Sequence, residues 1–207
     1  MTLVLLGEST GTVITETCKR LKWGRMWVHR KINIYEGEKW GFDNGAFGDW
    51  DKVNAMVFFD LDSYRRRLDR AYSVGVPFLA VVPDLIANEK SLDFSLECLE
   101  MMPKEWPNYL AVQDGMTTAS VEGVLAKFAG IFVGGSTRFK STLPEWTTLA
   151  HRHGKRVHYA RCSGPRRLER AMALGVDSVD SSQPLWSREL LRKYVFAFEH
   201  PTQCMGV

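Results

Sequence analysis

The sequence predicts a (β/α)8 TIM barrel, an α/β fold, formed by a single domain that spans residues 1–207. Short β-branched or apolar runs alternate with helical patterns from residue 2 to residue 200, which is typical of parallel βα units. Eight such runs can be counted, and eight is the strand number of a closed barrel. The chain is 45% hydrophobic and 25% charged over 207 residues, which fits one globular domain.

The predicted strands are short, and turn residues bound most of them. They are expected at Leu3–Leu6, Met26–His29, Lys39–Phe42, Pro77–Val82, Tyr109–Gln113, Gly130–Gly134, Arg156–Arg161 and Asp177–Asp180.

Helical segments lie between most of these strands and carry apolar residues at helical spacing, as in Leu92, Leu96 and Leu99. Residues typical of helix ends support these segments, because Pro165 stands at a helix start and Gly175 directly follows the same helix. The helices are expected at Gly11–Leu21, Asp60–Val74, Glu89–Met102, Thr118–Phe128, Leu143–His153, Pro165–Leu174 and Leu185–Phe198.

The segment from Met26 to Gly41 has two strand patterns and no helix between them, so the second βα unit is predicted to be degenerate. A doubly wound open sheet is the alternative architecture. In both architectures the functional groups lie where the parallel strands end.

Acidic residues stand at or beside four of these strand ends, at Asp43, Asp84, Asp114 and Asp180. One such residue is normally a helix cap or a turn residue, but four acidic residues on one rim of the barrel favour a catalytic site. Two carboxylates that face a sugar carbon suit glycosyl transfer, in which one attacks the anomeric carbon and the other handles a proton. Glycines at the same rim would let a flat heterocycle lie against backbone; they are Gly45, Gly134 and Gly135.

Five segments, in order along residues 40 to 185, resemble motifs of the tRNA-guanine transglycosylase superfamily. Phe42–Phe47 is similar to its D-S-G-G-[FY] motif, and Asp84 to the acid of its substrate pocket. Ala111–Gly115 is similar to its V-Q-G-G motif, and Phe132–Gly135 to its glycine-rich strand end. Gly175–Ser181 is similar to its G-[IV]-D-x-F-D-C motif.

The resemblance implies a pentosyltransferase in which Asp180 is the nucleophile at C1′ and displaces guanine. Asp43 would be the general base that deprotonates the incoming base, and Asp177 is the fallback for Asp180. Asp84 and Gln113 would hydrogen-bond the heterocycle. Gly134 would offer it backbone. Apart from the resemblance, Gly135 and Gly45 are expected to leave the same kind of room, and we hypothesise that Trp50 or Phe47 stacks on the base, with packing in the barrel core as the alternative role. No cofactor is implied.

The chain departs from the tRNA enzymes of that superfamily, which carry a zinc site with clustered cysteines, because its tail has only His200 and Cys204. We therefore expect no metal. As a compact chain without the zinc cluster, the protein resembles the phage-type DNA transglycosylases. These enzymes replace guanine in DNA with a 7-deazaguanine such as preQ0 and so protect the DNA from restriction. The expected partners are DNA and the free 7-deazaguanine base, with tRNA as the alternative polymer.

A base inside a duplex cannot reach such a pocket, so the enzyme would flip it out or act on single strands. Phosphates are expected along a basic stretch that has no acidic residue between Glu16 and Glu36. Its cations are Lys19, Arg20, Lys22, Arg25, Arg30 and Lys31. By contrast, Arg65–Arg67 with Arg70 are diluted by acids and are expected on a solvated helix face.

Two further readings stay open. Gly134–Ser136, followed by Thr137 and Arg138, resembles a phosphate-binding loop, which would suit a metabolic barrel isomerase or lyase of a small phosphosugar. A nucleic-acid-binding barrel without catalysis is the third class.

Asp60 and Asp62 could hold a divalent ion, but capping of the following helix is the favoured role. The histidines His151, His153 and His158, with Cys162, are likewise not expected to bind metal.

The N-terminal run Met1–Gly7 lacks the basic start and the length of a signal peptide or a membrane span. The four cysteines are scattered, which favours a reducing compartment. We expect a cytoplasmic protein, in the host cytoplasm if a phage encodes it, without membrane contact. The sequence carries no prediction of oligomeric state.

Overall fold

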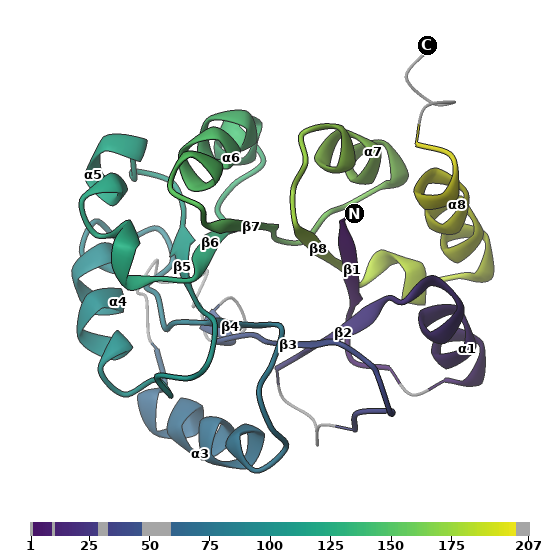
Figure 1. Ribbon diagram of the computed structural model, residues 1–207, viewed down its shortest axis with the longest axis horizontal. Helices are drawn as coiled ribbons and strands as arrows, with labels where there is room; N and C mark the ends of the chain where they lie inside the picture. Colours follow the sequence, from purple (N-terminus) through teal and green to yellow (C-terminus); the bar gives the residue numbers. More distant parts are fainter. Residues whose placement is uncertain (1, 10, 29–32, 47–58, 202–207) are drawn as a thin grey trace.

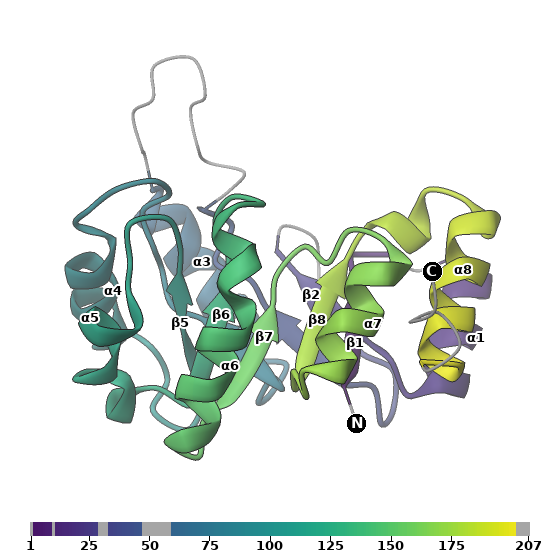
Figure 2. The same cartoon turned by 90° about the horizontal axis from the view of Figure 1, so that it is seen from above.

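The computed structural model describes residues 2–9, 11–28, 33–46 and 59–201. Eight parallel strands form a closed barrel in the order β1 to β8, and β8 pairs with β1 with Leu5 opposite Asp180 (Figure 1). Helices surround the strands on the outside, as both views show (Figure 2). The predicted (β/α)8 architecture is confirmed, and closure of the sheet excludes the doubly wound alternative.

The strands are three to five residues long and almost entirely buried. They are β1 (Leu3–Leu6), β2 (Gly24–Trp27), β3 (Trp40–Phe42), β4 (Leu79–Val81), β5 (Asn108–Val112), β6 (Gly130–Val133), β7 (Arg156–Tyr159) and β8 (Ser178–Ser181).

The part of the chain that the structure describes contains seven α-helices. They are α1 (Thr12–Leu21), α3 (Leu61–Tyr72), α4 (Ser91–Leu99), α5 (Thr118–Glu122), α6 (Leu143–Arg152), α7 (Pro165–Ala173) and α8 (Arg188–Glu199). The helix predicted at Thr118–Phe128 is instead two short pieces, because α5 ends at its cap Gly123 and a 3-10 turn follows at Leu125–Lys127.

Asp60 caps α3, as predicted, since its carboxylate accepts a hydrogen bond of 2.8 Å from the backbone N–H of Ser63. The expectation of a fully solvated α3 face is wrong at Arg67, which is buried. Its guanidinium donates to the backbone carbonyls of Val28 and Asn44 at 3.1 and 2.8 Å. Arg67 therefore supports the loops that follow β2 and β3 at the mouth of the barrel.

No helix covers the second unit within the described residues 33–39, and a buried ion pair takes its place. The side chain of Arg25 points out of the barrel towards α1, where it is 0% exposed and pairs with Glu38. It also donates to the Thr15 hydroxyl at 3.0 Å and lies over the ring of Tyr35. Because the loop before β3 seals this side of the sheet, the degenerate unit needs no helix.

Strand β2 begins at Gly24, two residues earlier than predicted. A Cβ atom at Gly24 would lie 2.0 Å from the carbonyl oxygen of Lys39, so only glycine allows the backbones to approach this closely. The sequence pattern missed this start because glycine and arginine are weak signals for a buried strand.

Alternation along the strands decides which side chains reach the inside of the barrel. Leu5, Met26, Tyr109 and Ala111 belong to an inner apolar cluster. Residues two positions further towards the carboxyl end therefore face the mouth of the barrel. This periodicity brings together Asp43, Gln113, Gly134, His158 and Asp180.

Candidate active site

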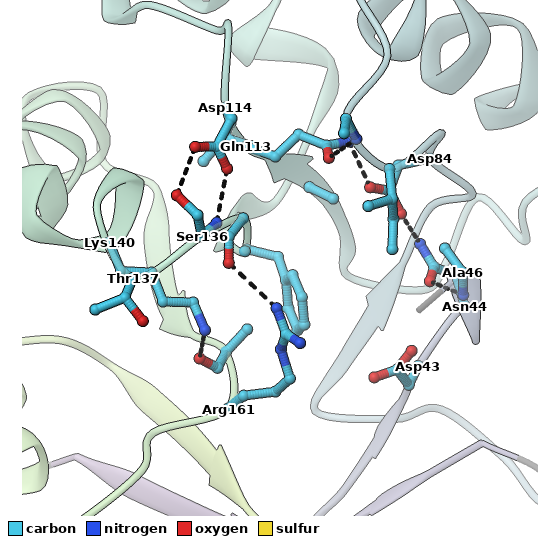
Figure 3. A pocket seen from close by; sticks show the side chains of 18 of the residues that line it. Asp43, Asn44, Ala46, Asp84, Gln113, Asp114, Ser136, Thr137, Lys140 and Arg161 are labelled. Carbon is cyan, nitrogen blue, oxygen red and sulfur yellow. Dashed lines mark hydrogen bonds between the residues drawn. The ribbon is translucent and has the colours of Figure 1, made fainter. Parts of the chain in front are cut away.

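Two adjoining cavities lie at the carboxyl ends of the strands. The larger has a volume of about 600 Å³ and extends from Asp43 and Asp84 across to Lys140 and Arg161 (Figure 3). The smaller, of about 440 Å³, contains Asp180. Asp43 and Arg161 line both cavities, so they form one continuous site.

Asp180 is held through one oxygen only. Its Oδ1 accepts hydrogen bonds from the backbone N–H of Arg161 at 2.8 Å and from Nε2 of His158 at 2.9 Å. Within the described residues, Oδ2 accepts none, and the side chain is 15% exposed into the smaller cavity. Arg161 has a φ of 47°, an unusual conformation for a residue with a side chain, and this turn aims its N–H at the carboxylate. The geometry orients Asp180 and leaves one oxygen available to a ligand.

His158, which the sequence suggested only as a metal ligand, contacts Asp180 in the candidate site. It is fully buried on β7 and stacks on Phe132, with ring centroids 4.8 Å apart and planes at 7°. Its Nδ1 lies 2.8 Å from the Ser178 hydroxyl. A histidine that donates from Nε2 to a carboxylate has Nδ1 as acceptor when neutral, so Ser178 can donate to it. Two-residue periodicity on β7 could have identified this inward position.

Asp43 follows β3, and β1 and β2 separate that strand from β8 in the sheet. Its Oδ1 accepts a hydrogen bond of 2.7 Å from the backbone N–H of Gly45. Burial raises the pKa of Asp43, and the nearby negative charge of Asp180 raises it further. A raised pKa makes Asp43 easier to protonate than an ordinary aspartate, which suits a group that gives up and takes up a proton.

Asp84 is buried after β4, and both its oxygens are oriented by amides. Oδ1 accepts a hydrogen bond from Asn44 at 2.7 Å, and Oδ2 accepts one from Gln113 at 2.9 Å. Burial, with a contribution from Asp43, raises the pKa of Asp84 to about 7. Each oxygen keeps a lone pair for a ligand in the larger cavity, which Asp84 lines.

Gln113 has a different role from the expected one. Its Oε1 accepts from the N–H of Ala87 at 2.8 Å, and its Nε2 lies within 2.9 Å of acceptors on Asp84, Leu85 and Ser91. An amide nitrogen has two hydrogens, so no donor is left for a ligand. Gln113 therefore orients Asp84, and in this arrangement its amide nitrogen has no free hydrogen for a ligand.

The three candidate glycines differ. Gly134 lines the larger cavity, and a Cβ there would meet nothing closer than 3.5 Å. Gly135 has a φ of +72°, and its Cβ would lie 2.6 Å from an oxygen of Asp114. Gly45 has a φ of +77°, and its Cβ would lie 2.9 Å from the guanidinium of Arg67. Gly45 is not among the lining residues and serves the packing of the loop instead.

Asp114 occupies the place where the Gly134–Ser136 loop would cradle a phosphate. Its carboxylate accepts hydrogen bonds of 2.6 Å from both the N–H and the hydroxyl of Ser136. Burial alone would raise the pKa of Asp114, but these two bonds hold it below its usual value. An ionised carboxylate at this position repels an anion, so the structure does not support this loop as a phosphate cradle.

The basic stretch predicted to hold phosphates does not lie at the site. Arg25 cannot contact a phosphate, because its side chain is in the core and paired with Glu38. Lys19, Arg20 and Lys22 end α1 just before β2 begins, which places them at the opposite end of the barrel from the cavities. Arg20 also pairs with Glu199 at 2.5 Å. Four further residues predicted to contact the substrate lie outside the described residues: Arg30, Lys31, Phe47 and Trp50.

Other side chains that the sequence analysis did not single out line the mouth. Trp186, in the turn after β8, is 68% exposed beside Asp180. Lys140 is buried after β6, and Arg167 lies on the first turns of α7. These residues follow strand ends, but their spacing matches no motif, so only the three-dimensional arrangement reveals them.

Among the residues that the structure describes, no three His, Cys, Asp or Glu side chains are grouped closely enough to hold a metal ion. His151 and His153, at the end of α6, instead contact Asp177 and Glu122 at 3.2 and 2.9 Å. Asp177 also accepts from the N–H of Val157 at 2.8 Å and lies at the opposite end of β8 from the cavities. No helix within the described ranges is long and apolar enough to cross a bilayer.

Comparison with models of known protein families finds no family that matches the chain, and comparison with curated proteins finds no matching relative.

Proposed function

We propose that the protein is a base-exchange glycosyltransferase that replaces guanine in DNA with a 7-deazaguanine such as preQ0. The observation that supports it best is the pair of carboxylates at the mouth. Asp180 is fixed through Oδ1 with Oδ2 available, and Asp43 has a raised pKa and lines the same cavity. These properties suit Asp180 as a nucleophile and Asp43 as an acid/base group.

In the first step, Oδ2 of Asp180 attacks C1′ of the deoxyribose. The C1′–N9 bond breaks, its electron pair leaves with guanine, and protonated Asp43 supplies the proton that guanine takes up. In the second step, Asp43, now a carboxylate, removes the N9 proton of the incoming base. N9 then attacks C1′ and breaks the ester bond to Asp180. Two inversions retain the configuration, and no oxidant or cofactor is consumed.

The larger cavity suits a flat base with neighbouring N–H groups. Asp84 is fixed by Asn44 and Gln113 so that its remaining lone pairs can accept from the N1–H and N2–H groups of a guanine-like edge. Phe132 and Ala111 supply apolar wall, and Gly134 leaves room for the ring. Deazaguanines keep this edge, so the same site would accept both the departing and the incoming base.

A nucleic acid would present an extruded or single-stranded nucleotide to the mouth. Trp186 is well placed to stack on a neighbouring base, because it is exposed beside Asp180. The predicted stacking residues Phe47 and Trp50 lie outside the described residues, so their role stays a prediction beside that of Trp186.

The test is a base-exchange assay. Purified protein is incubated with guanine-containing single-stranded DNA or with tRNA, plus preQ0 or labelled guanine, and the nucleosides are identified by mass after digestion. We expect incorporation into DNA, which Asp180→Asn lowers by at least 10⁴-fold, whereas the matched change Asp62→Asn on α3 has no effect. Incorporation only into tRNA would overturn DNA as the substrate and still support the base-exchange reaction. Activity of Asp180→Asn near that of wild type would overturn the mechanism.

His158→Ala provides a second test of the same geometry. Loss of a charge-assisted hydrogen bond to Asp180 should lower exchange by about 10- to 100-fold, at about 1.5–3 kcal/mol. His153→Ala, on the exposed end of α6, is the control and should leave exchange unchanged. Equal rates for the two variants would show that His158 does not orient the nucleophile.

A further inference from the structure

A third, smaller cavity of about 180 Å³ adjoins the reaction site between β6 and α7. Thr137, Lys140 and Arg167 line both this cavity and the larger one (Figure 3 shows the first two). Ser141, Tyr159 and Arg170 complete its polar wall. Three cations and three hydroxyl groups therefore surround a space that is large enough for a tetrahedral anion.

The cations of this cavity have neutral partners. Lys140 donates to the carbonyl oxygen of Ala160 at 2.7 Å, Arg167 to the Ser163 hydroxyl at 2.6 Å, and Arg170 to the Ser141 carbonyl at 3.4 Å. Within the described ranges none of these three forms an ion pair, whereas Arg20, Arg152 and Lys193 each pair with a glutamate.

Lys140 is the most informative of the three. The residue is only 7% exposed, yet its ammonium group has one hydrogen-bond acceptor among the described residues for three N–H groups. Burial lowers the pKa of Lys140 to about 8, and the positive charge of Arg161 lowers it further. The negative charge of Asp180 offsets only part of this effect, and Lys140 has no ion-pair partner among the described residues. A buried cation without such a partner is costly, and an anion in the cavity would lower that cost.

We propose that Lys140, Arg167 and Arg170, with the hydroxyls of Thr137 and Tyr159, form a phosphate-binding subsite beside the reaction pocket. The geometry fits an anion that accepts from several sides at once, as the oxygens of a phosphate do. The subsite does not depend on base exchange. The phosphate can belong to a phosphodiester of a nucleic acid or to the phosphomonoester of a small sugar, and the two sources are distinguished by experiment.

The test measures binding of two probes by the full chain: a single-stranded DNA nonamer with one central guanine, and ribose 5-phosphate. Arg170→Gln changes an exposed residue, and Lys140→Met removes the buried ammonium. Arg192→Gln, on the outer helix α8, is the matched control. Because Arg170 is exposed, its variant keeps the test valid even if Lys140→Met fails to fold.

A phosphodiester ligand predicts that both variants weaken nonamer binding about tenfold and lower the salt slope by about one, while the control matches wild type. A phosphomonoester ligand predicts the same tenfold loss for ribose 5-phosphate alone; the subsite would then stand while base exchange in DNA loses support. Unchanged binding of both probes by Arg170→Gln and a folded Lys140→Met would overturn the subsite, whatever the result of the base-exchange assay.

Discussion

The raised pKa of Asp84 makes a measurable prediction about stability. Burial raises this pKa from its ordinary value of 3.8 to about 7. The folded protein therefore holds the proton more tightly than the unfolded chain does, so the contribution of Asp84 to the free energy of unfolding is fully present below pH 4 and is lost as pH rises through 7. At about 1.4 kcal/mol per pKa unit, the loss between pH 5 and pH 8 is roughly 3 kcal/mol.

Asp84→Asn removes this titration. We expect the free energy of unfolding in urea to fall less between pH 5 and pH 8 in the variant than in wild type, by roughly 3 kcal/mol. In thermal unfolding the same difference is about 6–12 °C for a chain of this size. Asp62→Asn is the control, because the Asp62 side chain is 78% exposed, and its pH dependence should follow wild type. Parallel pH profiles for Asp84→Asn and wild type would refute the raised pKa.

Three other predictions test the fold and the placement of the site. Arg25→Met should lower the free energy of unfolding in urea by about 3–5 kcal/mol, because it leaves Glu38 buried without its partner. The double variant Arg25→Met/Glu38→Leu should recover most of that loss. A double variant as unstable as the single one would contradict the pairing. Gly135→Ala should destabilise by about 1–3 kcal/mol through its positive φ and its contact with Asp114, whereas Gly134→Ala should cost less than about 1 kcal/mol; equal costs would contradict the geometry. Neutralising the basic end of α1 should leave DNA affinity and its salt dependence unchanged, and a flatter salt slope would return the nucleic acid to that end of the barrel. The residues to neutralise are Lys19, Arg20 and Lys22.

Strand periodicity made the barrel predictable from the sequence. The run Leu3–Leu6 has the predicted bounds, and β7 and β6 start at the predicted residues Arg156 and Gly130. Parallel strands end on one rim, so an acid at a strand end could be assigned to the site without knowing the neighbours of each strand. Asp43, Asp84 and Asp180 were found in this way, and the structure brings all three to the mouth.

The errors came from residues whose role depends on partners distant in the chain. Arg25 belongs to a basic stretch in the sequence, but its strand position turns it towards Glu38 and α1. Gln113 reaches the predicted place, but loop residues after β4 take up its amide. Lys140 has no local signature, and periodicity on β7 indicates only that His158 points inward; the contacts of both residues depend on the neighbouring strands.

Trapping of a covalent intermediate tests the proposed chemistry most directly. Protein is incubated with a single-stranded guanine-containing oligonucleotide without an incoming base, denatured, and separated by electrophoresis, and the modified peptide is identified by mass. We expect a covalent protein–DNA species with deoxyribose attached at Asp180, which is absent from Asp180→Asn and present in Asp62→Asn. Base exchange that proceeds without such a species, or an adduct on any other residue, would contradict the assignment of Asp180 as the nucleophile.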